Sequence, residues 1–262
     1  MDFNQQVITE FRANAGKVTY FEDARLLLLT TTGARTGRAH TTPLGYLHDP
    51  ADRVLIIASA GGSPNHPAWY HNIKANPQVT VEDGIFTYQA EATILPGRER
   101  DEAFARAAEA DPGWADYQAK TTRTIPVVAL TQTAHDIPTL VQIHDSLRRE
   151  MAIIRKEAAT GTTLGAQLRV NCLTVCRGLT FHHTKEDQGL FPYLAAQHPD
   201  LAPTLERLDE EHQQIAVLVD ALQQALAGDD ADQVRAEVER LTEQLENHLA
   251  YEEEQLLPLL PQ

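Results

Sequence analysis

Two kinds of hydrophobic pattern follow one another along the chain. Up to about residue 132, short apolar or alternating runs are separated by Gly, Pro, Asp and Asn, as in GARTG, HDPADR and EDG. Runs of this kind predict a β-sheet. The expected strands are residues 25–31, 41–48, 53–59, 78–83, 85–95 and 125–131, and helices are expected at residues 3–15, 67–76 and 98–110.

Beyond residue 136 the strand pattern stops, and apolar residues recur at intervals of three and four, as along one face of a helix. Asp136-Ile-Pro138 has the form of a helix cap followed by a first-turn proline. Helix breaks are expected near Thr160-Gly161, Pro199–Pro203 and Gly228-Asp229, which leaves four helices. The clearest periodic positions are Leu205, Leu208, Ile215, Leu218, Leu222 and Leu226, followed by Val234, Val238, Leu241, Leu245 and Leu249.

The predicted fold class is therefore α+β with two domains. A domain rich in β-strands is expected over residues 1–133, and an all-α up-down four-helix bundle is expected over residues 134–262. The boundary between them is placed near residues 132–136, where the strand pattern gives way to the helical one.

Charge is distributed unevenly between these two parts. Residues 1–132 contain 12 Lys and Arg against 15 Asp and Glu, a net charge of −3, whereas residues 133–262 contain 10 against 22, a net charge of −12. So acidic a half disfavours nucleic acid as a partner. It is compatible with a site for cations, although acidic helix faces are also common where a surface contacts only water.

No apolar run approaches the roughly 18 residues of a membrane-spanning helix, so no membrane span is expected. The first residues, MDFNQQVITEF, lack the basic segment and apolar stretch of a signal peptide. The only cysteines, Cys172 and Cys176, lie four residues apart in a predicted helix. Free thiols fit a reducing cytoplasm, and both are expected to be small buried side chains.

The acidic half contains an internal repeat. HHTKEDQGLFPYL, which begins at His182, aligns with HLAYEEEQLLPLL, which begins at His248. The alignment matches Glu186 with Glu252 and places Leu, Pro and Leu at equal offsets. The shared core of the two copies is therefore His-x3-Glu.

A further histidine precedes each copy at nearly the same distance, His144 by 38 residues and His212 by 36. Residues four apart lie on the same face of a helix, so the His and the Glu of each copy can point at one metal ion. Four helices with such faces turned inward would surround two ions, and imidazole with carboxylate suits iron, manganese or zinc. One such pair alone is usually a surface ion pair, but two copies in register predict a metal site.

Residues 140–260 resemble the hemerythrin-like (HHE) domain family, because FHHTKEDQGLFPYL and NHLAYEEEQLLPLL are typical of it. The resemblance implies a four-helix bundle that holds two non-haem irons and reacts with O2 or related small molecules. It also implies that Glu186 and Glu252 bridge the irons. The implied iron ligands are His144, His182, Glu186, His212, His248 and Glu252.

In one respect the sequence departs from the oxygen-carrying members of that family. They have a fifth histidine four residues after the third-helix ligand, where this chain has Ala216. One ligand fewer argues against simple reversible O2 carriage and leaves room for sensing or redox chemistry. His183, next to an implied ligand, is expected to face away from the site, and His198, beside a loop proline, is expected to be solvated.

The N-terminal half has two loops rich in small residues. The turn at residues 33–37 carries Arg35, with Arg38 directly after it, and the loop at residues 59–62 separates a predicted strand from a predicted helix. Small residues let backbone N–H groups approach an anion, and arginines supply positive charge. A helix N-terminus after the second loop would also favour an anionic ligand. Ordinary turns would explain either loop by itself.

Residues 20–131 resemble the deazaflavin-dependent nitroreductase family through LLTTTGARTGRAHTTPL, ASAGGSPNHPAWYHNIKANP and DYQAKTTRTIPVV. The resemblance implies a split β-barrel that binds coenzyme F420; FMN is the alternative cofactor, because split barrels also hold it. Some members carry a basic residue where Ala60 stands. The implied cofactor-binding residues are Arg35, Arg38, Thr42, Pro43, Leu44, Ser59, Ala60, Gly61 and Gly62, with Trp114 and Tyr117 on the substrate side. Trp69 and Tyr70 are expected to pack in the core.

No side chain in this half pairs a nucleophile with a base, which fits hydride transfer, where the cofactor does the chemistry and the protein orients it. Ser59 and Tyr117 are the catalytic candidates, as hydrogen-bonding groups for a substrate oxygen. The leading hypothesis is an F420-dependent oxidoreductase that couples oxidation of reduced F420 to O2 or nitrogen-oxide chemistry at a di-iron site.

Two alternatives remain at this stage. The bundle could be a sensor of O2, nitric oxide, redox state or iron that regulates the reductase, or the chain could bind iron or O2 without turnover. The expected partners are a small-molecule substrate, O2 or nitric oxide, and a second copy of the chain, since split barrels often form homodimers. The sequence carries no interface signature for such a dimer.

Overall fold

The computed structural model describes residues 1–262 except residues 1, 22–23, 134–137, 161–163 and 261–262. The chain divides into two compact units, Met1–Pro138 with Gly165–Val170 and Thr139–Leu164 with Asn171–Gln262. The predicted boundary at residues 132–136, the predicted cap at Asp136 and the predicted break at Gly161 fall wholly or partly outside the described residues.

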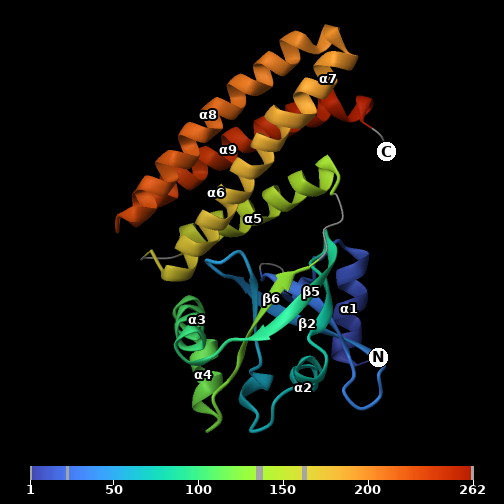
Figure 1. The fold of residues 1–262 in the computed structure, drawn as a ribbon. Coiled ribbons are helices and arrows are strands. Elements are labelled where there is room, and N and C mark those ends of the chain that lie inside the picture. The colour runs from blue at the N-terminus through green and yellow to red at the C-terminus, as the bar shows by residue number, and fades with distance from the viewer. Residues whose placement is uncertain (1, 22–23, 134–137, 161–163, 261–262) are drawn as a thin grey trace. The chain divides into compact units, whose positions relative to one another are not determined.

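Six antiparallel strands form a closed barrel in the first unit, in the order β1-β2-β3-β6-β5-β4 (Figure 1). The strands are β1 (Leu26–Thr32), β2 (Ala39–His48), β3 (Val54–Ile57), β4 (Gln78–Glu82), β5 (Thr87–Ile94) and β6 (Val127–Gln132). The barrel closes because β1 pairs with both β2 and β4. The predicted barrel is confirmed, and each strand overlaps the run from which it was predicted.

The alternation of side chains along β1 explains its run of four leucines. Leu27 and Leu29 point into the barrel, where they pack with residues from the other strands, whereas Leu26 and Leu28 pack outside against helix α1 (Phe3–Ala13). Because both faces of the strand are buried, no polar residue interrupts the run. Burial of one such leucine stabilises the fold by roughly 1.5–3 kcal/mol.

Helices α2 (Ala68–Ala75), α3 (Gly97–Ala110) and α4 (Gly113–Ala119) also belong to the first unit. Trp69 and Tyr70 of α2 are buried in the core of the barrel, as expected. Helix α4 was not predicted, because its seven residues are too few to show a helical repeat.

Long helices build the second unit, which confirms the predicted bundle (Figure 1). They are α5 (Leu140–Thr160), α6 (Ala166–Lys185), which belongs to this unit from Asn171 on, α8 (Ala202–Ala227) and α9 (Ala231–Leu256). Helix α9 packs against both α5 and α8. The buried positions of α8 and α9 follow the predicted apolar stripe except at Leu218, which is half-buried while its neighbour Val219 is buried.

The second helical segment of the bundle does not end at Lys185. A π-helical turn, Glu186–Leu190, carries it on into α7 (Phe191–Gln197), and the N–H of Phe191 donates to the carbonyl of Glu186, five residues earlier. Pro192 follows directly; proline has no N–H, and its ring clashes with the carbonyl four residues before it. Turns of this kind occur frequently at functional sites.

Cys172 and Cys176 of α6 are buried thiols that form no disulfide, as expected. Burial raises the pKa of Cys176 to about 11, so its thiol stays protonated near neutral pH. Among the described helices, none has an apolar stretch long enough to cross a membrane.

Candidate metal centre and cofactor site

The six predicted metal ligands lie together inside the bundle. None of them is more than 5% exposed. They lie on α5 (His144), α6 (His182), the π-helical turn (Glu186), α8 (His212) and α9 (His248 and Glu252). These are core positions, where an imidazole or a carboxylate is costly to bury unless it has a partner.

The four histidines form two close pairs. The Nε2 atoms of His144 and His182 are 3.2 Å apart, and those of His212 and His248 are 3.1 Å apart. Each pair consists of the two histidines of one copy of the sequence repeat, so the two copies correspond to two halves of the site.

The two carboxylates lie between these pairs. Glu186 Oε1 is 3.3 Å from His182 Nε2, and its Oε2 is 3.5 Å from His212 Nε2. Glu252 Oε2 is 3.3 Å from His144 Nε2 and 3.7 Å from His248 Nε2. Each carboxylate therefore faces both histidine pairs, which is the placement that a bridge between two metal ions requires.

The carboxylate oxygens are short of partners. All four oxygens of Glu186 and Glu252 are buried without a hydrogen-bond partner among the residues that the structure describes. Burial, together with the charge of Glu252, raises the pKa of Glu186 to about 10. Burial is the largest influence on the pKa of Glu252 and acts to raise it, but the interactions with His144, Glu186 and His248 together outweigh burial and lower the pKa. A cation between the two carboxylates would replace the missing partners, so the donor set fits a metal.

Carboxylates outside the centre orient the histidines. The Nδ1–H groups donate to carboxylates as follows: His144 to Glu253 at 2.8 Å, His212 to Asp187 at 2.6 Å and His248 to Glu211 at 3.0 Å. With its proton held at Nδ1, an imidazole presents the Nε2 lone pair inward, as a metal ligand must. Burial lowers the pKa of His248, and that of His182 to about 3, so both rings are neutral near pH 7.

These outer carboxylates were missed from the sequence, although the repeat carries a signal for two of them. Asp187 and Glu253 directly follow the two glutamates, at matching positions. Asp187, in the first copy, accepts a hydrogen bond from His212, and Glu253, in the second copy, accepts one from His144. Each of these bonds therefore joins the two copies of the repeat. Glu253 also accepts a hydrogen bond of 2.7 Å from Arg148, which lies one turn after His144 on α5.

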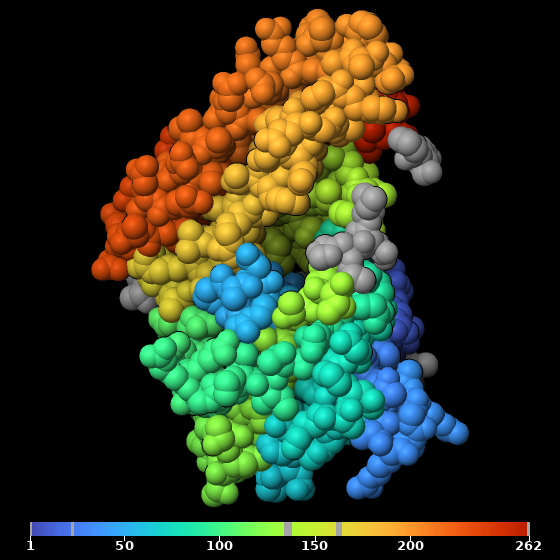
Figure 2. Space-filling view, in the orientation of Figure 1, coloured from blue at the N-terminus to red at the C-terminus, as the bar shows by residue number. Residues whose placement is uncertain are grey.

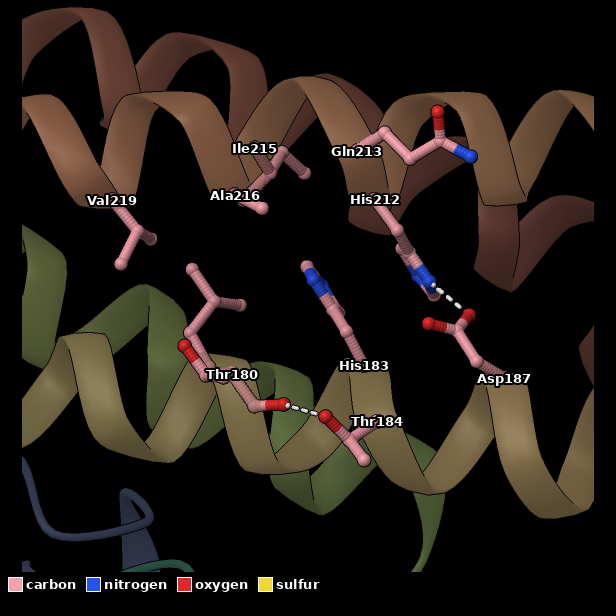
Figure 3. A pocket seen from close by; sticks show the side chains of 10 residues that line it. Thr180, His183, Thr184, Asp187, His212, Gln213, Ile215, Ala216 and Val219 are labelled. Atoms are coloured by element: carbon pink, nitrogen blue, oxygen red, sulfur yellow. Dashed lines mark hydrogen bonds and ion pairs between the residues drawn. The ribbon is translucent and has the colours of Figure 1, made fainter.

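His183 does not face away from the centre, and that expectation was wrong. Its side chain is buried, and its ring stacks on that of His212 with centroids 3.9 Å apart and planes 11° apart (Figure 3). Helix α6 buries neighbouring residues in pairs, as at 171–172 and 175–176, so its inward face is wide enough for both His182 and His183. Figure 2 shows α6, in yellow, meeting α8, in orange, along this side of the bundle.

The potential ligand atoms form two groups, each with all its atoms within 4.8 Å of one another. One group contains His144, His182, Glu186 and Glu252, and the other contains His183, His212 and His248. A groove of about 170 Å³ between α6 and α8 reaches the second group and is lined by His183, His212 and Ala216 (Figure 3).

In the first unit, the implied cofactor residues lie in two places. Arg35 and Arg38 are exposed on the turn between β1 and β2, and Arg35 lines a cavity of about 460 Å³ together with His71 and Asn72 of α2. Thr42, Pro43 and Leu44 lie on β2, opposite Leu29, Leu28 and Leu27 of β1. Asn72, which sequence reasoning missed, accepts a hydrogen bond of 3.0 Å from the N–H of Ala34 and so fixes the turn to α2.

The second place is the loop that follows β3. Ser59 precedes a tight turn, Ala60–Gly62, which packs against α4 and so lies beside the helix that carries Trp114 and Tyr117. Gly62 has φ of 85°, and a side chain there would come within 2.8 Å of the Tyr117 carbonyl oxygen. Only glycine fits such a position.

Arg123 holds this loop and was also missed. Its guanidinium donates to the carbonyls of Ala58 at 3.0 Å, Ser59 at 2.7 Å and Ser63 at 2.9 Å. The residue lies inside the quoted motif DYQAKTTRTIPVV, so the motif indicated its neighbourhood but not its partners.

The chain thus joins a closed barrel with arginines exposed on one turn to a helical bundle with buried pairs of histidines suited to a cation. Comparison with known proteins names both. Residues 3–132 match the family described as F420H(2)-dependent quinone reductase, and residues 135–260 match the family described as hemerythrin HHE cation binding domain. The chain belongs to the F420H(2)-dependent quinone reductases, a family of F420-dependent oxidoreductases, and carries a hemerythrin HHE domain fused to it. Both predicted resemblances are confirmed, although the description of the first family names quinones, not nitro compounds.

Relatives of known name match the reductase part. An F420H(2)-dependent quinone reductase of Mycobacterium tuberculosis is 42% identical over 111 residues, which are 40% of this chain and 72% of the relative. The solved structure of an F420-H2 dependent reductase is 42% identical and covers 40% of this chain and 93% of its own, with a TM-score of 0.38. A chain solved as a domain-swapped dimer is 38% identical and covers 48% and 92%, with a TM-score of 0.40.

Proposed function

We propose that this chain oxidises reduced F420 at the barrel and holds two iron ions in the bundle, and that the two units act in one redox reaction. The observation that carries the metal assignment is the pair of buried carboxylates, without hydrogen-bond partners among the described residues, each lying between two histidine pairs.

His144 and His182 would hold one ion, and His212 and His248 would hold the other, with Glu186 and Glu252 bridging them. Imidazole with carboxylate is a donor set that suits iron, and bundle interiors are known sites for iron pairs. When bound, reduced F420 supplies a hydride and an iron pair exchanges electrons with O2 or nitric oxide.

The size of the groove at the second group supports a small ligand for the iron. Its volume of about 170 Å³ lies below the roughly 300–1,000 Å³ of sites that take drug-sized organic molecules. O2 or nitric oxide fits such a space. The organic acceptor is therefore assigned to the barrel.

In the barrel, Arg35 and Arg38 would bind the anionic tail of F420, because both are exposed positive charges on one turn and Arg35 lines a cavity there. The Ser59–Gly62 loop would lie along the deazaflavin ring, and Trp114 and Tyr117 would contact the acceptor. A quinone is the proposed acceptor, since the relatives are named for it. The hydride and one proton convert it to the quinol.

Titration with F420 tests the barrel assignment. We expect Arg35→Gln to weaken binding about tenfold, because each charge-assisted hydrogen bond contributes about 1.5 kcal/mol or more. Arg98→Gln is the matched control, because the Arg98 side chain is 91% exposed on α3 and does not line the cavity of Arg35. Equal affinities for the parent chain and Arg35→Gln would remove Arg35 from the site.

Consumption of reduced F420 tests the coupling of the two units. We expect iron-loaded chain to consume reduced F420 faster in air than under nitrogen, and we expect both chelation and Glu252→Gln to abolish the difference. Glu254→Gln, exposed two residues further along α9, is the matched control.

The outcomes of this experiment separate the candidate functions. Equal rates with and without iron contradict coupling. A spectral change at iron on addition of O2 or nitric oxide, with no turnover of that gas but an altered rate of quinone reduction, indicates the sensor. Failure to bind either F420 or FMN indicates a binding protein without reductase chemistry.

A further inference from the structure

The two halves of the metal centre do not have the same donors. The repeat matches His182 with His248 and Glu186 with Glu252, but the position next to the ligand differs: it is His183 in the first copy and Leu249 in the second. The extra histidine therefore has no counterpart by symmetry.

His183 has a buried ring nitrogen that is available to bind a metal ion. It is 7% exposed, and its Nε2 atom is buried without a hydrogen-bond partner among the described residues. A buried imidazole nitrogen left unpaired is costly, so its persistence at a metal centre calls for an explanation. Its potential ligand atom lies within 4.8 Å of those of His212 and His248.

The neighbouring helix leaves room for this arrangement. Ala216 is one turn after His212 on α8, and both line the groove in which the ring of His183 lies (Figure 3). An alanine at position 216 supplies no donor and fills little of the space. The ring of His183 instead occupies it from the opposite helix, α6.

We propose that His183 is a third histidine ligand to the ion held by His212 and His248, and that it supplies from α6 the donor that α8 lacks at Ala216. This inference rests on the proposed dinuclear centre. It gives the second ion three imidazoles and the first ion two, with both bridging carboxylates shared.

Replacement of His183 by phenylalanine separates ligation from packing. His183→Phe keeps an aromatic ring that can stack on His212, but it removes the nitrogen. His198→Phe is the matched control, because His198 lies in the loop between α7 and α8. Circular dichroism and unfolding of the metal-free proteins establish that each variant is folded.

Metal binding is then measured by anaerobic equilibrium titration of the full chain with Fe(II), followed by Mössbauer spectroscopy of the loaded protein. We expect the parent chain and His198→Phe to bind two ions. In His183→Phe, we expect the affinity for one of the two ions to fall about tenfold or more, with a changed quadrupole doublet for that ion only. The double variant His183→Phe with Ala216→His should recover the lost affinity, because it returns an imidazole to the same ion from α8.

The results that overturn the inference are distinct from those that overturn the centre. Two ions at parental affinity and an unchanged spectrum in folded His183→Phe would show that His183 only stacks. A parent chain that binds one ion or none would overturn the dinuclear centre and the assignment of His183 with it. If His183→Phe does not fold, X-ray absorption of the iron-loaded parent chain tests the inference instead. An average of two imidazoles per iron contradicts the extra ligand, and a higher average supports it.

Discussion

At the scale of single residues, the centre consists of polar groups at positions that would otherwise be filled by leucine. His212 lies in the buried stripe of α8 between Leu208 and Ile215, and Glu252 lies in that of α9 before Leu256. The sequence predicted the role of the polar residues in these stripes because the repeat contains each of them twice. It did not predict the inward orientation of His183, because this histidine occurs in one copy only and its orientation depends on how wide a face α6 buries.

Glu186→Gln should have opposite effects on stability with and without metal. Folding of the metal-free chain near pH 7 requires Glu186 to take up a proton, since its pKa rises from 4.5 when unfolded to about 10 when folded. A glutamine removes that cost, so we expect the metal-free variant to be more stable by about 1 kcal/mol or more. With iron, the variant should lose the stabilisation that the bridging oxygen provides.

The pH dependence has a definite sign. Below pH 4.5 Glu186 is protonated in both the folded and the unfolded chain, and its contribution to the free energy of unfolding is then most favourable. As the pH rises from 4.5 toward 10, only the unfolded chain releases this proton readily, so the free energy of unfolding decreases. The metal-free parent should therefore lose stability over this range relative to Glu186→Gln. Urea unfolding at several pH values measures this, and parallel profiles for the two proteins would contradict it. Glu254→Gln, exposed on α9, should stay within about 0.5 kcal/mol of the parent.

At the scale of secondary-structure elements, periodicity was sufficient wherever an element was long or buried on a regular face. The strands and the long helices of the bundle followed from alternation and from apolar spacing. The π-helical turn at Glu186–Leu190 did not, because it depends on where backbone N–H donors go around Pro192. The loop after β3 also did not, since its geometry depends on Arg123, which is 60 residues away from Ser63 in sequence.

Arg123→Met should loosen that loop. The change removes the donors to three carbonyls, at Ala58, Ser59 and Ser63, so we expect the first unit to be destabilised by about 2–3 kcal/mol. F420 should also bind more weakly, because the loop is part of the proposed site. Chemical unfolding and F420 titration measure the two effects.

The control for this prediction is Arg98→Met, which removes the same charge from an exposed position of α3. Parental stability in both Arg123→Met and Arg98→Met would show that the hydrogen bonds of Arg123 are replaced by water at no net cost.

At the scale of the whole molecule, the chain is two units with separate cores, and each could be predicted from its own segment. The barrel core draws on residues from all six strands, and the centre of the bundle draws on its own helices. Apolar spacing does not report on how one unit affects the other, so the proposed coupling rests on the joining of the two units in one chain and not on a residue pattern.

Removal of metal should distinguish the two units in an unfolding experiment. Ligands that bind only the folded state stabilise it by about 2.7 kcal/mol at a concentration 100 times the dissociation constant. In calorimetry we therefore expect a chelator to lower the unfolding temperature of the bundle and leave that of the barrel unchanged. F420 should shift only the barrel. A single transition that moves as a whole with either ligand would contradict this independence.

The difference between His183 and Leu249 has a consequence for electron transfer. If His183 is a ligand, the two irons lie in unequal surroundings and have unequal reduction potentials. Iron held by His183, His212 and His248 would then differ in potential from iron held by His144 and His182, so the pair would exchange its two electrons in separate one-electron steps. Under the proposed function, such a pair would connect a two-electron donor, reduced F420, to acceptors that take one electron at a time.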